Sequence, residues 1–227
     1  MKKIGMLVAV EMDAVLRRYG TAEQVERRHG FEMHRYDMGG YELYVLRSGA
    51  GEIAAAAATQ MLIDRYEAEL VVNFGVVGGL TEEMAQTKTC VVERLVHYDF
   101  DTSAYDGTLP GQYFEYPDVY LYPTPALVDR AVAICPELKR VTCASADKFV
   151  DGEEAKRALH ETWGADICEM EAAAVVLTCD RSGVPCLLIK AVSDSMGGGA
   201  EDFAKEFERC AAICLETVDR IINSGIV

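Results

Sequence analysis

The fold class is clearest in residues 165–194, which read ADICEMEAAAVVLTCDRSGVPCLLIKAVSD. A short strand is predicted over Ala165–Cys168, and the alanine-rich segment Glu169–Asp180 is predicted to be a helix. The apolar run Cys186–Val192 is typical of a strand that is covered on both faces. Strands that alternate with helices of this length indicate an α/β fold around a mostly parallel sheet.

The same alternation runs through the rest of the chain. Further strands are expected at Ile4–Val10, Leu70–Phe74, Cys90–Leu95 and Arg140–Ser145. Further helices are expected at Glu11 to about Tyr19, Ile53–Arg65, Pro125–Ile134, about Glu153–Thr162 and Glu201–Ile222. Glu32–Met38 and Tyr41–Ser48 flank Gly39-Gly40 and predict a β-hairpin, which makes the sheet mixed. We therefore expect residues 1–227 to form one α/β domain, a three-layer fold with helices on both sides of a mixed, mostly parallel central sheet.

The composition excludes several classes of protein. The chain of 227 residues contains 37 Asp and Glu against 22 Lys and Arg, and half of its residues are hydrophobic. The apolar content is too high for a disordered chain, and a net charge of −15 leaves no basic stripe for nucleic acid or an anionic membrane. No apolar stretch reaches the ~18 residues of a membrane span. We expect a globular protein without nucleic-acid or membrane partners.

The cysteines and histidines indicate neither disulfides nor a metal site. The eight cysteines lie in or beside apolar runs, and none forms a Cys-x-x-Cys pair. The four histidines do not cluster with them in a zinc-binding pattern. Buried thiols are typical of a reducing compartment, so we expect a cytoplasmic protein.

Two glycine-rich segments are candidate ligand sites. Gly49-Ala50-Gly51-Glu52-Ile53-Ala54 lies between a strand and a helix, but a dinucleotide site needs an acidic residue about 20 positions further on. The chain has Val72-Asn73-Phe74-Gly75 there, so we interpret the segment as tight strand-to-helix packing. Gly75-Val76-Val77-Gly78-Gly79 follows a buried strand, at the sheet edge where open α/β proteins bind ligands.

Acidic residues follow three of the predicted strands at this edge. Asp194 follows one strand and precedes a run of three glycines, and Glu11 and Asp13 follow the first strand. Glu169 and Glu171 are predicted to open a helix, where only one of the two can face a pocket, and spacing does not select between them. Converging carboxyl groups can cleave a glycosidic bond, because one protonates the leaving group while another activates water. Turn formation and helix N-termini are the structural alternatives for these residues.

Residues 98–122 form an unusual segment. They hold six of the eleven tyrosines and two phenylalanines, with three prolines in or beside them. Disordered loops are poor in aromatic residues, so this segment is expected to pack against something. A satellite cluster on its own domain is one interpretation, and we favour a subunit interface or a pocket lid.

Together these segments resemble the nucleoside phosphorylase/nucleosidase superfamily, and within it the methylthioadenosine/S-adenosylhomocysteine nucleosidases. The resemblance extends nearly end to end and rests on Ile4–Asp13, Ser48–Gly51, Asn73–Leu80, Tyr98–Gln112, Ser145–Val150, Glu169–Glu171 and Ser193-Asp194. It implies an α/β domain, usually a homodimer, that hydrolyses the N-glycosidic bond of 5'-methylthioadenosine or S-adenosylhomocysteine and releases adenine. It implies no metal and no cofactor.

The resemblance also implies roles for individual residues. Asp194 would protonate N7 of the adenine, and Asp13 would activate water. Phe149 would stack on the base while the backbone of Val150 reads its edge. Glu171 would hold the ribose hydroxyls with Met170 against the sugar, which selects Glu171 over Glu169. Val76, Val77, Gly78 and Ser193 complete the expected substrate-binding set, and the segment 98–122 would reach a neighbouring subunit's alkylthio pocket.

Two positions depart from the family pattern. Asp13 stands where the nucleosidases have a Glu, and a displacement of about 1 Å can cost ~100-fold in rate. Val76 stands where a Ser is usual, and phosphorylases use a hydroxyl there, with arginines, to bind phosphate. Val76 offers no donor, and Arg17, Arg18 and Arg47 are the only obvious cations nearby. This favours water over phosphate as the nucleophile.

Other functions stay open at this point. One alternative is a hydrolase or phosphorylase of another nucleoside, with a futalosine-type or purine substrate. Another, motivated by Asp13 and Val76, is a nucleoside-binding protein with weak turnover. A more distant alternative is a NAD-binding oxidoreductase.

Overall fold

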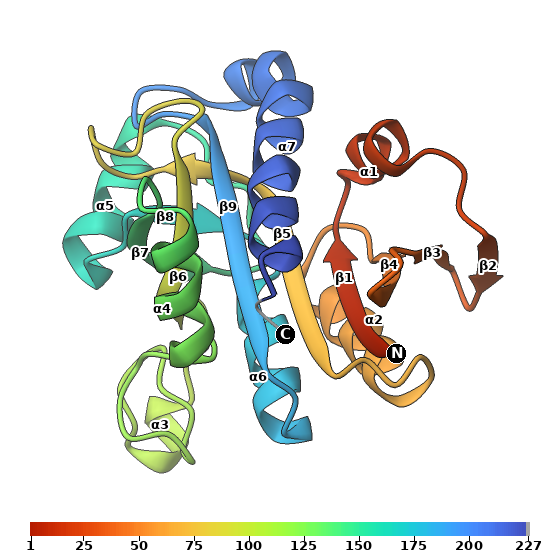
Figure 1. Ribbon diagram of the computed structural model, residues 1–227. Helices are drawn as coiled ribbons and strands as arrows, with labels where there is room; N and C mark the ends of the chain where they lie inside the picture. The colour runs from red at the N-terminus through yellow and green to blue at the C-terminus, as the bar shows by residue number, and fades with distance from the viewer. Residues whose placement is uncertain (226–227) are drawn as a thin grey trace.

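The computed structural model describes residues 1–225, which contain nine strands and seven helices (Figure 1). The strands are β1 Lys2–Val8, β2 Gln24–Arg28, β3 Phe31–Asp37, β4 Tyr41–Arg47, β5 Leu70–Gly79, β6 Thr89–His97, β7 Lys139–Ser145, β8 Ile167–Glu169 and β9 Cys186–Asp194. The helices are α1 Met12–Tyr19, α2 Glu52–Asp64, α3 Ser103–Asp106, α4 Pro125–Ile134, α5 Glu153–Trp163, α6 Ala172–Ser182 and α7 Ala200–Asn223. Every predicted strand and helix is present, with ends that differ from the prediction by a few residues.

All nine strands of the described residues belong to one mixed sheet, in the order β2-β3-β4-β1-β5-β8-β7-β6-β9. The central strand β5 is parallel to β1 and β9. Antiparallel pairings join β6 to β9 and β8 to β5, whereas β7 is parallel to both β6 and β8. Because β9 pairs with β5 as well as β6, five strands close into a ring at one end of the sheet. The predicted hairpin is formed by β3 and β4.

Helices cover both faces of the sheet, as the three-layer prediction requires. Alternate residues of a strand point to opposite faces, so Leu7 and Leu188 belong to one core while Val8 and Ile189 belong to the other. Helices α2 and α6 pack together over the first core, and α7 runs along β5 and β9 over the second (Figure 1). Over residues 1–225, no helix has both the length and the apolar character to cross a membrane.

Three differences from the prediction affect the candidate site. β5 continues through Gly79, so the glycine-rich segment is the end of a strand, with a bulge between Val77 and Gly78. Helix α6 begins at Ala172, so Glu169 is the last residue of β8 and Glu171 is the cap of the helix. β2 is an additional, mostly exposed strand whose charged sequence has no apolar alternation.

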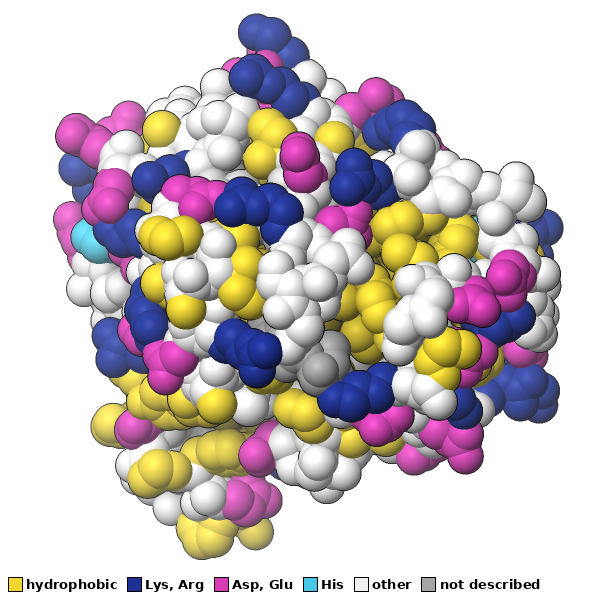
Figure 2. Space-filling view, in the orientation of Figure 1, with side chains coloured by type: hydrophobic (Ala, Val, Ile, Leu, Met, Phe, Trp, Pro, Cys, Tyr) yellow, Lys and Arg dark blue, Asp and Glu magenta, His cyan; other side chains and the backbone are white. Residues whose placement is uncertain are grey.

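The segment 98–122 packs in part on its own chain. The rings of Phe100 and Tyr113 stack with centroids 4.0 Å apart, and the Tyr120 hydroxyl donates to the carbonyl of Trp163. Tyr105 and Phe114, by contrast, are 93% and 73% exposed. Figure 2 shows hydrophobic side chains gathered at the lower left, over the part of the molecule that carries α3. The segment therefore has a packed inner layer and an exposed apolar tip.

Candidate active site

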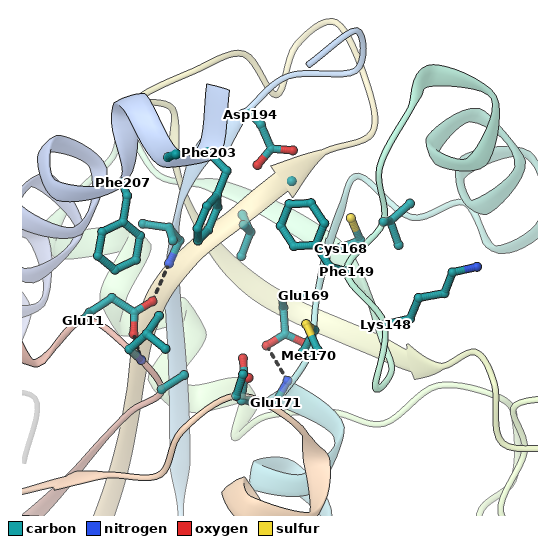
Figure 3. A pocket seen from close by; sticks show the side chains of 18 residues that line it. Glu11, Lys148, Phe149, Cys168, Glu169, Met170, Glu171, Asp194, Phe203 and Phe207 are labelled. Atoms are coloured by element: carbon teal, nitrogen blue, oxygen red, sulfur yellow. Dashed lines mark hydrogen bonds between the residues drawn. The ribbon is translucent and has the colours of Figure 1, made fainter. Parts of the chain in front are cut away.

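A cavity of about 440 Å³ lies at the carboxyl ends of β1, β5, β8 and β9. Parallel strands such as β1, β5 and β9 end at one edge of a sheet, which is where open α/β folds bind ligands. Residues from these strand ends and from α7 line it (Figure 3). Asp194 lies at one end of the cavity and Glu171 at the other, with Glu11 to one side. Three carboxyl groups from three different strand ends therefore face one space.

Asp194 is the last residue of β9 and is buried between two partners. Its Oδ2 accepts a hydrogen bond from the Lys156 ammonium at 2.5 Å, and its Oδ1 accepts one from the Ser193 hydroxyl at 2.8 Å. Lys156 is fully buried and also donates to the carbonyls of Ser195 and Gly198. The carboxyl group is therefore held in one orientation at the cavity wall.

Glu11, not Asp13, brings the carboxylate of the first strand to the cavity. Glu11 caps α1, is 3% exposed, and accepts backbone N–H groups from Val76 at 3.1 Å and Val10 at 2.9 Å. Asp13 lies in the first turn of α1 with its side chain exposed to solvent, and it does not line the cavity. The prediction of Asp13 at the site is thus corrected, because the helix begins one residue after Glu11 and turns Asp13 outward.

The close approach of Glu11 depends on the glycine at position 75. A Cβ atom there would lie 2.9 Å from Glu11 Oε1 and 3.7 Å from the Lys190 ammonium. The first distance is too short for a side chain, whereas the second is an ordinary contact, so glycine is needed here for the approach of Glu11.

Glu169 and Glu171 both line the cavity, so the prediction that only one of them faces it was wrong. It assumed helical geometry, but neither residue lies within α6. Glu171 Oε1 accepts the N–H of Gly51 at 2.8 Å. Burial, followed by the charge of Glu169, raises the pKa of Glu171 to about 7. Glu169 is buried except where it lines the cavity, and it pairs with the Lys190 ammonium at 3.0 Å.

Electrostatics set different protonation states for these groups. Burial opposes ionisation of Glu169. The charge of the Lys190 ammonium and the hydrogen bonds that Glu169 accepts nevertheless hold the pKa of Glu169 below its usual value. Burial also opposes the charge of Lys190, yet Glu169 and Glu171 raise the pKa of Lys190. Glu169 and Lys190 thus form an ion pair in which Glu169 is part of the cavity wall, whereas burial and the charge of Glu169 raise the pKa of Glu171 to about 7.

Apolar side chains form the walls between the carboxyl groups. Phe149 and Phe203 meet edge to face, with ring centroids 5.5 Å apart, and Phe207 lies one helical turn beyond Phe203 on α7. Met170 lies between Glu169 and Glu171, and Phe149 is partly exposed at the cavity (Figure 3). Apolar walls with exposed aromatic rings suit a planar aromatic base.

Comparison with known proteins identifies the family, because the phosphorylase superfamily matches residues 3–226. The chain belongs to the phosphorylase superfamily. A 5'-methylthioadenosine/S-adenosylhomocysteine nucleosidase of Shewanella loihica is 32% identical over 200 residues, which cover 85% of this chain and 86% of that protein. An aminodeoxyfutalosine nucleosidase of Campylobacter jejuni is 27% identical over 219 residues, covering 91% and 92%. The structure of a Helicobacter pylori 5'-methylthioadenosine/S-adenosylhomocysteine nucleosidase with butyl-thio-DADMe-Immucillin-A is similar with a TM-score of 0.91, at 27% identity and 99% coverage of both chains.

Most of the residues predicted for the site line the cavity of this phosphorylase-superfamily protein. They are Asp194, Phe149, Val150, Met170, Glu171, Val76, Val77 and Gly78. Asp13 and Ser193 do not line it. Ser193 is corrected from a substrate-binding to a supporting position, since its hydroxyl points to Asp194 and to the carbonyl of Val77.

Several residues of the site were missed in the sequence. Lys190 interrupts an otherwise apolar strand, and a buried lysine needs an acidic partner. Its position in the sequence therefore indicated a buried ion pair. Phe203 and Phe207 are four residues apart on a helix that follows Asp194, a spacing that places them on one face. Lys156 gave no signal, because it lies in a charged helix whose orientation toward Asp194 only the tertiary fold determines.

Other predicted features of this superfamily member lie outside the cavity. Arg17 and Arg18 pair with Glu208 and Asp219 of α7, and neither they nor Arg47 line the cavity. No residue of the segment 98–122 lines it, so in this chain the segment is no lid over its own cavity. All eight cysteines are buried free thiols. Among residues 1–225, no three His, Cys, Asp or Glu side chains are grouped so that they could hold a metal ion.

Proposed function

We propose that this protein hydrolyses the N-glycosidic bond of 5'-methylthioadenosine or S-adenosylhomocysteine and releases adenine and a 5-thioribose product. The observation that carries the proposal is the pair of carboxyl groups Asp194 and Glu11 on one apolar cavity, with Glu171 as a third. Glycoside hydrolysis requires one group to protonate the leaving base and another to activate water. The similarity to nucleosidases supports an adenine nucleoside as the substrate.

Each group has a defined step in the proposed reaction. The bond between C1' and N9 breaks, and its electron pair leaves with the base. Asp194, which takes up a proton from solvent when the nucleoside binds, delivers that proton to N7, and the proton later released from Glu11 returns to solvent. The Lys156 ammonium stabilises the carboxylate that remains. A water oxygen then bonds to C1', and its proton passes to Glu11. Glu171 binds the ribose hydroxyls, and Phe149 and Met170 pack against base and sugar.

The environment of Glu11 favours water over phosphate as the nucleophile. Phosphate binding in a loop requires free backbone N–H donors, but the N–H groups of Val10 and Val76 already bind the Glu11 carboxylate. A phosphate dianion at this position would also face a buried carboxylate. Val76 supplies no hydroxyl, and Lys190, the cation beside Gly75, is already paired with Glu169.

A second candidate substrate is aminodeoxyfutalosine. The similarity to the Campylobacter jejuni aminodeoxyfutalosine nucleosidase supports it, because that comparison covers as much of the chain as the methylthioadenosine enzymes do. The proposed acid, base and ribose-binding residues would serve both substrates, so only the substituent at C5' distinguishes them.

A panel of nucleosides tests the proposal, with free base measured by chromatography in the presence and absence of phosphate. We expect adenine release from the two thionucleosides without any phosphate requirement. A strict phosphate requirement, or tight binding without base release, would contradict hydrolysis. Asp194→Asn is expected to lower kcat by about 10²–10⁴-fold while the protein stays folded, because an amide cannot deliver the proton.

We also infer that the protein is a cytoplasmic homodimer. The exposed apolar tip of the segment 98–122, with Tyr105, Leu109 and Phe114, supports a surface that a second copy covers. Eight buried free thiols support a reducing compartment. Sedimentation equilibrium tests the dimer: a monomer at micromolar concentration would contradict it, and Phe114→Ser should weaken association.

A further inference from the structure

The first backbone N–H groups of α6 are bound by side chains from three separate parts of the chain. The N–H of Ala172 donates to Glu169, that of Ala173 to the Ser145 hydroxyl at 3.1 Å, and that of Ala174 to Glu52 Oε2 at 2.6 Å. Glu52 is the first residue of α2 and is 6% exposed. One glutamate thus joins the beginnings of two helices beneath the cavity.

The Ser145 hydroxyl lies between two carboxyl groups. Its oxygen is 2.5 Å from Glu52 Oε1 and 2.5 Å from Glu169 Oε1. A hydroxyl carries one proton and donates it to only one of these oxygens. The other short contact joins two oxygens and requires a second proton, which one of the carboxyl groups must carry.

The surroundings assign this proton to Glu52. Glu169 receives the Lys190 ammonium and the N–H groups of Glu171 and Ala172, all of which favour its charged form. Glu52 receives one backbone N–H, from Ala174, and makes no ion pair with any of residues 1–225. A protonated Glu52 donates to Ser145, and Ser145 then donates to Glu169.

Glu52 is also linked to the cavity through its own backbone. Its N–H donates to Asp147 Oδ1 at 2.7 Å, and the N–H of the preceding Gly51 donates to Glu171. Gly51 has φ +104°, and a Cβ atom there would lie 2.8 Å from Asp147 Oδ1. The turn that holds Glu171 in the cavity therefore keeps its position only while α2 stays docked on α6.

We infer that Glu52 is a positioning residue that acts in its protonated form, holding α2 on α6 so that Gly51 fixes the carboxylate of Glu171. This inference rests on the proposed role of Glu171 in binding the nucleoside. Glu52 touches no substrate in this scheme and acts through Glu171.

The groups around Glu52 make loss of its proton disruptive. Glu169 from β8 faces it across Ser145, Glu171 lies at the cap of α6, Asp147 binds its backbone, and Tyr113 approaches from the segment 98–122. All of these are neutral or negative, and the buried cation Lys190 pairs with Glu169. Burial and the charge of Glu169 raise the pKa of Glu52 to about 8. Above this pH two carboxylates would oppose each other across one hydroxyl.

The variant Glu52→Gln tests the inference, because its amide can donate to Ser145 and accept from Ala174 but cannot ionise. In the wild type, we expect KM for the nucleoside to rise about tenfold per pH unit above pH 8, with a smaller change in kcat. In Glu52→Gln, KM should match the wild type at pH 7 and stay nearly constant to pH 9. Glu154→Gln is the matched control, since Glu154 is an exposed glutamate in the first turn of α5, and it should keep the wild-type profile.

Infrared difference spectra provide a readout that does not depend on enzymatic activity. Titration of the wild type should remove the carbonyl bands of two protonated carboxyl groups, with midpoints near 7 for Glu171 and 8 for Glu52. The second band should be absent in Glu52→Gln. The inference is overturned if KM of Glu52→Gln rises with pH in parallel with the wild type, or if no carboxyl band is lost near pH 8. Absence of base release by the wild type contradicts the proposed function instead, and the infrared test of Glu52 still applies.

Discussion

Glu11 and Asp13 are two residues apart at the start of α1, but the first is buried and the second is exposed to solvent. Glu11 is buried against β5 and bound by two backbone N–H groups, whereas Asp13 is exposed on α1. A general base must reach the water that attacks the sugar, so position separates the two residues although their chemistry is the same.

We therefore predict a large difference between two conservative substitutions. Glu11→Gln should lower kcat by about 10²–10⁴-fold with a smaller change in KM, because an amide accepts no proton. Asp13→Asn should leave kcat unchanged. Steady-state kinetics and melting temperatures of both variants check this, and a strong loss of kcat in Asp13→Asn alone would return the role to Asp13.

Three of the predicted residues that line the cavity share one property. Asp194, Met170 and Val76 lie within three residues of the ends of strands, and neighbouring strand ends meet at one edge whatever the rest of the fold does. The prediction placed Asp13 in the cavity, but Asp13 points to solvent. Glu11, two residues earlier at the start of α1, points to the cavity instead, because side chains two residues apart on a helix point in nearly opposite directions. Glu52 and Lys156 were missed because they come from helices, whose placement depends on tertiary packing.

At the level of elements, Lys156 connects α5 with the segment between β9 and α7. Its ammonium binds Asp194 and the carbonyls of Ser195 and Gly198, so one side chain orients the proposed acid and anchors the turn before α7. That helix carries Phe203 and Phe207 to the cavity. Lys156 therefore positions both the proposed acid Asp194 and the start of the helix whose phenylalanines form part of the cavity wall.

Lys156→Met should therefore impair both stability and turnover. Removing one partner of a buried ion pair costs about 3–5 kcal/mol, and a misplacement of about 1 Å in the acid costs ~100-fold in rate. We expect a lower melting temperature and a kcat lowered by about that factor. Arg157→Met on the same helix removes only an exposed pair with Glu153 and serves as the control. A wild-type kcat in a destabilised Lys156→Met would show a purely structural role.

The elements that were predicted well are those whose apolar pattern is set by burial. β9 and α4 lie where the sequence placed them, because the first is apolar throughout and the second begins at Pro125. β2 was not predictable from its pattern, since an exposed edge strand buries no face. The end of β5 was obscured by three glycines, which usually indicate a turn but here permit close contacts with Glu11 and Asp194.

For the whole molecule, the buried carboxyl groups predict how stability depends on pH. The pKa values of Glu52 and Glu171 rise from 4.5 in the unfolded chain to about 8 and about 7 in the folded protein. The folded state therefore holds more protons than the unfolded state between these values, so stability falls as pH rises from about 5 to 8. His97, whose pKa burial lowers, opposes this trend only below its usual value of 6.5.

The melting temperature should thus decrease between about pH 6 and 8, and the decrease should be smaller in Glu52→Gln. Calorimetry at constant ionic strength measures both slopes. Equal slopes in the two proteins would mean that Glu52 has the same charge in the folded and unfolded states over this range.

The ring formed by β5, β8, β7, β6 and β9 also determines which edge of the sheet is open for pairing with a strand of another molecule. Each strand in the ring has neighbours on both sides, so the outer side of β2 is the open edge of the described sheet. That edge carries Glu26, Arg27 and Arg28, which are engaged in ion pairs. A strand of another molecule could pair with this edge only if these charged groups lost their hydration. The cost of that dehydration opposes aggregation through strand pairing. A sheet that closes at one end and is charged at the other leaves little template for amyloid-like growth.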